Sequence, residues 1–129
     1  MQKITRDKAL KYEFNWQDDP LLHVKQGETF QVETWDAGSG KIKDPGDYNA
    51  IRNAPEWNSE PIKGNPIAGP IYVEGAEKGD LLEITLDAIE PVDHGWTMFA
   101  NDIGPLGDSK HWTELAKGTI HIIQHEPGP

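Results

Sequence analysis

The chain has 129 residues and a formal net charge of -10, with 22 Asp and Glu against 12 Lys and Arg. Such an acidic chain repels phosphate backbones and anionic lipid, so neither nucleic acid nor a membrane is expected as a partner. It has no cysteine, which excludes disulfides, thiolate nucleophiles and Cys-ligated zinc.

The first third of the chain reads as short strands separated by turns. Polar and apolar residues alternate over 10–15, which predicts a half-buried strand. A short apolar run at 21–24 is followed by a turn at 25–28. Residues 29–35 predict another strand, in which Phe30, Val32 and Thr34 share one face.

The chain loses regular alternation from residue 36 to 69, where Gly and Pro predict one long irregular loop. Strand patterns return at 70–75, 81–89, 96–100 and 119–125, and 81–89 has the most regular alternation of all. Residues 109–117 could form one or two helical turns.

Short strands with almost no helical period predict an all-β fold, either a sandwich or a barrel. We find no repeat and no low-complexity linker, so a single β domain over 1–129 is the simplest division. No apolar segment reaches the length of about 18 residues that a membrane helix needs, and the N-terminus lacks a signal-peptide pattern. A cytoplasmic location is therefore expected.

Two carboxylates near the end of the strand 29–35 are candidate site residues. The inward row of this strand continues in register to Asp36, which predicts a partly desolvated carboxylate that needs a cation or a hydrogen-bond donor. Alternatively, Asp36 starts an Asx turn, as Asp often does before glycines. Glu33 faces the opposite side on an ideal strand, so the two carboxylates are not expected to share a ligand.

Other chemistry has little support in the sequence. His121 and His125 lie four residues apart in a strand pattern, too far from each other to bind one ion. No Gly-x-Ser-x-Gly motif and no phosphate-binding glycine loop is present.

One stretch is more specific than its composition. Residues 65–86, with the sequence NPIAGPIYVEGAEKGDLLEITL, resemble a signature of the acetamidase/formamidase family. The resemblance extends upstream to 24–36, a strand that ends in Glu-Thr-Trp-Asp, and more loosely downstream to 95–97 and 104–107.

This resemblance implies an amidohydrolase that releases ammonia from small linear amides such as formamide or acetamide. It implies a β-sandwich of jelly-roll character, a homo-oligomer and a divalent metal, zinc or calcium, with no organic cofactor. A metal assists amide hydrolysis by polarising the carbonyl and activating water. Asp36 is then the expected metal ligand and a catalytic residue, Glu33 a base or a residue that supports the ligand, and Asn65 a substrate-binding residue.

The chain also departs from the family pattern. Family enzymes run to about twice this length, a size in keeping with two packed layers or domains. Their later Asn-Met-Asp and His-Ala-x-x-Gly-Asp-Gly-Glu segments are absent here. Three explanations stay open: the chain is a fragment, a partner chain supplies the rest, or catalysis has been lost.

The alternative function is a non-catalytic binding or interaction module. Such a module would use exposed aromatic residues and acidic loops to hold a ligand, a sugar or a partner subunit. The aromatic candidates are Trp16, Trp35, Trp57, Trp96 and Trp112. Aromatic residues in such folds more often belong to the core.

Overall fold

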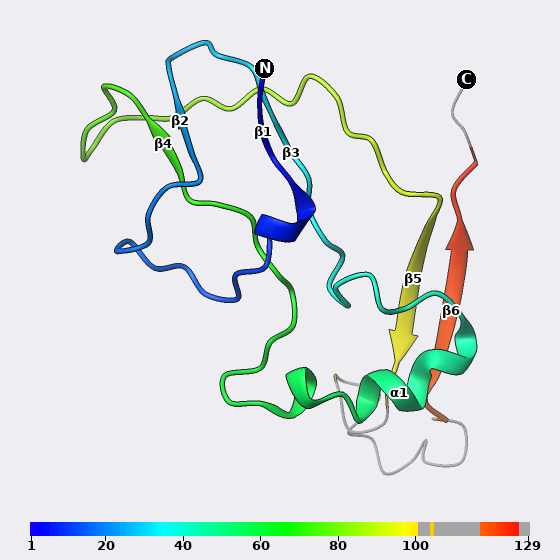
Figure 1. Cartoon of the computed structure of the whole chain (residues 1–129). Coiled ribbons are helices and arrows are strands. Elements are labelled where there is room, and N and C mark those ends of the chain that lie inside the picture. The colour runs from blue at the N-terminus through cyan, green and yellow to red at the C-terminus, as the bar shows by residue number, and fades with distance from the viewer. Residues whose placement is uncertain (101–103, 105–116, 127–129) are drawn as a thin grey trace. The chain divides into compact units, whose positions relative to one another are not determined.

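The computed structural model describes residues 1–100, 104 and 117–126 (Figure 1). Its strands and its α-helix are β1 (Gln2–Ile4), β2 (Leu22–Val24), β3 (Phe30–Val32), α1 (Tyr48–Arg52), β4 (Ile71–Val73), β5 (His94–Phe99) and β6 (Thr119–Gln124). Three short 3₁₀ helices span Arg6–Lys8, Pro45–Asp47 and Pro55–Asn58. The β-rich character expected from the sequence is therefore confirmed.

The chain divides into two compact units. The first comprises residues 1–40 and 55–85, and the second comprises 41–54 and 86–129. Each unit buries its own apolar side chains, as described below. The single domain over 1–129 stays a prediction.

The first unit is built on two parallel strand pairs around one core. β1 pairs with β3, with Ile4 opposite Val32, and β2 pairs with β4, with Val24 opposite Val73. Because strands present alternate residues to one side, each strand contributes a few apolar side chains to the same cluster. The buried members are Ile4, Leu22 and Val24, and the half-buried ones packed against them are Leu21, Phe30, Val32, Ala68, Ile71 and Val73.

The second unit is built on the antiparallel pair of β5 and β6, in which Trp96 lies opposite Ile122. Its buried side chains are Ile42, Ile51, Ala100 and Ile120. The 3₁₀ helix Pro45–Asp47 leads directly into α1, and Asp44 caps it by accepting a hydrogen bond from the backbone N–H of Gly46 at 2.7 Å. The Asp-Pro-Gly-Asp turn signal thus becomes a helix start, since a Pro is favoured at the first helical position.

Two strand predictions are wrong. Residues 10–15 form only an isolated bridge between Lys11 and Ile67, and Phe14 is 93% exposed. Residues 81–89 form no strand, because among the described residues none pairs with their backbone (Figure 1). Alternation alone does not make a strand, since a strand also requires a neighbour for its hydrogen bonds.

The long loop expected over 36–69 contains α1 and two of the 3₁₀ helices, so that prediction is only partly right. The helical turns expected over 109–117 lie almost entirely outside the described residues. The described strands form three separate two-stranded pairs, and the finer expectation of a jelly-roll sandwich stays a prediction.

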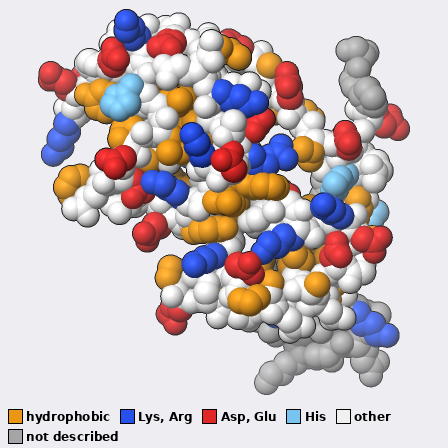
Figure 2. All heavy atoms as spheres, in the orientation of Figure 1, with side chains coloured by type: hydrophobic (Ala, Val, Ile, Leu, Met, Phe, Trp, Pro, Cys, Tyr) orange, Lys and Arg blue, Asp and Glu red, His pale blue; other side chains and the backbone are white. Residues whose placement is uncertain are grey.

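Acidic, basic and apolar side chains are interspersed over the face seen in Figure 2. Within the part of the chain that the structure describes, no helix has both the length and the apolar character needed to cross a bilayer.

Candidate functional site

The candidate site centres on a loop formed by residues 36–40, here called the Asp36 loop. The carboxylate of Asp36 accepts hydrogen bonds from two backbone N–H groups, that of Gly38 at 2.6 Å and that of Gly40 at 3.1 Å. The backbone oxygen of Asp36 accepts a third from Ser39 N–H at 2.9 Å. The Asx turn considered from the sequence is therefore present.

Asp36 is exposed, so the expectation of a partly desolvated carboxylate is wrong. Phe30 and Val32 do pack on the core, but Thr34 is exposed. Ladder bonding to β1 ends with Glu33, whose N–H donates to the Ile4 carbonyl at 2.9 Å. Beyond that bond the inward row no longer continues, and the chain turns outward.

Trp35 anchors the loop at its start. Its indole N–H donates to the Arg6 carbonyl at 2.9 Å, and the Arg6 guanidinium carbon lies 5.0 Å from the Trp35 ring centroid, a cation–π distance. The far side of the loop reaches the same ring, since a Cβ added at Gly40 would collide with Trp35. Gly40 also has a φ of +70°, which disfavours any side chain there.

Glu33 is engaged by two donors. Its carboxylate lies 2.7 Å from the Lys3 ammonium and accepts a hydrogen bond from Arg6 N–H at 3.0 Å. The Lys3 hydrogen bond is the main cause that lowers the pKa of Glu33, and the Arg6 backbone N–H adds to it. A carboxylate held anionic in this way is a weaker base, so Glu33 ties the end of β3 to the N-terminal segment.

The Asn-Pro segment meets the Asp36 loop. Asn65 N–H donates to the Ala37 carbonyl at 3.2 Å, and Asn65 adopts a φ of +54°, which Asn tolerates better than most residues. Two further bonds, in both directions between Ile67 and Lys11, fix the backbone that follows. The Asn65 side chain is exposed. Of the three candidate residues, the structure therefore brings Asn65 to the loop that Asp36 organises.

The donor set for a metal is incomplete in the described residues. No three His, Cys, Asp or Glu side chains come together as a metal-binding group over 1–100, 104 and 117–126. Both oxygens of Asp36 already accept backbone hydrogen bonds. The zinc or calcium ion implied by the resemblance would need further ligands, so no reaction step below passes through a metal.

The histidines act locally. His125 makes a 2.6 Å contact from Nδ1 to the Val92 carbonyl, and His94 contacts the Ile42 carbonyl at 3.4 Å. His121 is exposed on β6. These contacts are consistent with the absence of a His121–His125 metal pair from the sequence interpretation.

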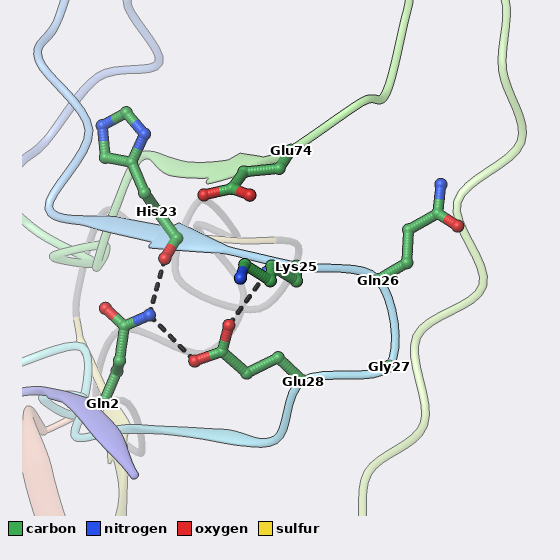
Figure 3. A pocket seen from close by; sticks show the side chains of 7 residues that line it. All are labelled: Gln2, His23, Lys25, Gln26, Gly27, Glu28 and Glu74. Carbon is green, nitrogen blue, oxygen red and sulfur yellow. Dashed lines mark hydrogen bonds between the residues drawn. The ribbon is translucent and has the colours of Figure 1, made fainter.

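A polar pocket, open to solvent, lies elsewhere in the first unit (Figure 3). Gln2 bridges it, donating from its amide to the His23 carbonyl at 2.6 Å and to Glu28 at 2.9 Å. Glu28 also accepts from Lys25 N–H at 2.9 Å. These groups satisfy one another, so the pocket has no unpaired group among them that calls for a ligand.

Sequence reasoning missed the N-terminal contribution to this region. Lys3 and Arg6 lie far from Glu33 in sequence, and β1 is only three residues long, too short for its alternation to be recognised. The pair of basic residues near an otherwise acidic chain's N-terminus was the only available signal. Arg6 also has a buried Nε with no hydrogen-bond partner.

The comparisons with known proteins agree with one another. The family model described as Acetamidase/Formamidase family matches residues 2–125. An acetamidase of Mycolicibacterium smegmatis is 33% identical over 92 residues, covering 70% of this chain and 21% of that protein. A formamidase of Methylophilus methylotrophus is 30% identical over 118 residues, covering 79% of this chain and 28% of that protein.

A solved structure has the same fold over this region. The crystal structure of an acetamidase from Bacillus halodurans superposes with a TM-score of 0.70 at 24% identity, covering 97% of this chain and 38% of that one. The chain spans about a quarter of the length of the curated relatives it matches, less than the half expected from the sequence.

Proposed function

The chain belongs to the acetamidase/formamidase family, and we propose that it acts as an amidohydrolase on small linear amides, releasing ammonia and a carboxylate. The observation that carries the proposal is the hydrogen bond between Asn65 and Ala37. It joins the two segments that resemble the family, the strand ending at Asp36 and the Asn-Pro motif, into one local structure.

The exposed carboxylate of Asp36 is the proposed base. Gly38 and Gly40 hold it in one orientation, so its remaining lone pairs are available to a water molecule or to an amide N–H of the substrate. Taking a proton from water as it attacks the amide carbon is general-base catalysis, which contributes about 10²–10⁴-fold to a rate.

Asn65 is the proposed substrate-binding residue. Its carboxamide can donate one hydrogen bond to the substrate carbonyl and accept one from the substrate NH₂ group. Its backbone conformation is fixed by the bond to Ala37, so less side-chain freedom is lost when a small amide binds. Such a small substrate offers few other groups for recognition.

The proposed metal assistance and a homo-oligomeric assembly come from the resemblance alone. A metal would polarise the substrate carbonyl when bound. Asp36 is the candidate ligand within the loop, and the other ligands would have to come from outside the described residues or from another chain. A cytoplasmic location is proposed on the same sequence grounds as before.

The test is ammonia release from formamide and acetamide by the full chain, with and without added zinc or calcium. Asp36→Asn removes the charge but keeps an oxygen that can form the Asx turn, and we expect it to lower kcat at least about 100-fold. Asp19→Ala, at an exposed carboxylate elsewhere in the first unit, is the matched control and should keep wild-type activity.

Wild-type chain that releases no ammonia under any of these conditions would contradict the proposal. The binding-module alternative would then gain support, and one observation favours it. Trp16 is 90% exposed in an irregular segment, whereas Trp35 is packed between Arg6 and Gly40. Amide binding without turnover, followed by titration calorimetry, would be the expected signature of that alternative.

A further inference from the structure

Segment 81–89 has the composition of a strand but no partner. Leu82, Ile84 and Leu86 are 57%, 76% and 71% exposed. Among the described residues, no hydrogen bond joins the backbone of 81–89 to any other residue. The segment therefore presents both apolar side chains and unpaired backbone groups to solvent, as Figure 1 shows by the plain tube between β4 and β5.

An exposed extended segment of this kind is a template for pairing with another chain. Backbone hydrogen bonds provide affinity in such strand addition, and alternate side chains provide specificity. Burial of the apolar row adds a favourable term in proportion to the area removed from water. The remaining question is which strand fits.

We propose that this segment is a dimerisation strand, which pairs antiparallel with the same segment of a second copy, with Ile84 opposite Ile84. The apolar row is palindromic about Ile84, so this register places Leu82 of each copy opposite Leu86 of the other. On the other face, Glu83 lies opposite the uncharged Thr85. A two-fold axis through the Ile84 pair makes the contact self-complementary and closed.

Other registers are disfavoured by charge or by polarity. Sliding the strands by two residues places Glu83 opposite Asp87, and parallel in-register pairing places Glu83 opposite its own copy. Like charges directly opposite each other are destabilising. A slip of one residue places Leu82 opposite Asp87 and so opposes an apolar side chain with a charged one.

The net charge of -10 on each copy determines how such a dimer responds to salt. The two copies repel each other, and this repulsion extends over about 30 Å at 0.01 M salt but only about 8 Å at 0.15 M. Salt therefore strengthens a contact between two copies. Salt would weaken a contact with a basic partner strand, which is the competing occupant.

The experiment is sedimentation equilibrium of the full chain from micromolar to millimolar concentration, at low and at moderate salt. We expect a monomer–dimer equilibrium whose Kd falls as salt is added. Ile84→Lys should raise Kd at least about tenfold, because it places two ammonium groups opposite each other and removes a central apolar contact.

Leu81→Lys is the matched control for the register. Leu81 is 95% exposed and belongs to the other row, where the proposed pairing puts it opposite Asp87. The variant should therefore keep or tighten the dimer through a cross-strand ion pair. A monomer at every concentration and salt, equal weakening by both variants, or a Kd that rises with salt would each overturn the proposal. None of these outcomes depends on amidase activity.

Discussion

Gly40 shows how one residue shapes the candidate site. It combines a φ of +70° with a close approach to the Trp35 ring, and its N–H is one of the donors that hold the Asp36 carboxylate. A side chain here is strained by the backbone and also displaces the indole. The position therefore couples the folding of the Asp36 loop to the packing of Trp35.

We expect Gly40→Ala to destabilise the chain by more than Gly27→Ala does. Gly27 has a similar φ of +74° but nothing within 4 Å of an added Cβ, so it isolates the backbone strain, about 1–2 kcal/mol. The difference between the two variants then measures the collision with Trp35. Urea denaturation of both variants gives the comparison, and equal destabilisation would contradict the packing argument.

Asn65 permits a separation of side-chain from backbone effects. Asn65→Gly keeps access to the φ of +54° and the bond to Ala37 but lacks the carboxamide, whereas Asn65→Ala also strains the backbone. If the carboxamide binds substrate, Asn65→Gly should raise the KM for formamide about tenfold or more without loss of stability. Unchanged kinetics in the glycine variant would assign Asn65 to the turn alone.

At the scale of elements, the ion pair of Glu33 joins the end of β3 to the segment that carries β1. Its pKa is lowered, chiefly by the Lys3 hydrogen bond, so the pair stabilises the fold above the unfolded-state pKa of about 4.3. That contribution is lost as the pH falls through the lower folded-state pKa.

Glu33→Gln should therefore lower the urea midpoint at pH 7 and have little effect at about pH 2, where the wild-type carboxylate is also protonated. Lys3→Gln, which removes the other partner, should show the same pH dependence. The expected destabilisation is small because both side chains are partly exposed. A midpoint difference that persists unchanged at the acidic pH would point to packing instead of charge.

At the scale of the whole molecule, acid should weaken both units. The pKa values of Asp7, Glu28 and Glu33 in the first unit and of Asp47 in the second are all lowered. The first-ranked cause is a hydrogen bond in each case, from Thr5, Lys25, Lys3 and Lys43 respectively. Each folded carboxylate holds its proton less tightly than the unfolded one does.

The unfolded chain thus binds more protons, and the free energy of unfolding should fall as the pH drops below about 4. Circular dichroism during urea titration between about pH 7 and 3 measures this trend. A urea midpoint that stays constant over the range would show that these hydrogen bonds contribute little to stability in solution.

The sequence by itself determined the β-rich character, the family and the positions of several elements. The runs around β2, β3, β4, β5 and β6 were each expected, because a short apolar or alternating run bounded by Gly or Pro has few other conformations. Asp36 was expected either as a desolvated carboxylate or as the start of an Asx turn, and the local Gly38 and Gly40 donors realise the turn. Local chemistry was sufficient for these features.

Only the tertiary structure decided which segments meet. The bond between Asn65 and Ala37, the ion pair of Glu33 with Lys3, and the parallel pairing of β1 with β3 join residues that are distant in sequence. The segment 81–89 shows the same limit from the other side, since its alternation is regular but its partner is not among the described residues. Periodicity reports which face of a segment is apolar, whereas pairing depends on which backbone lies beside it.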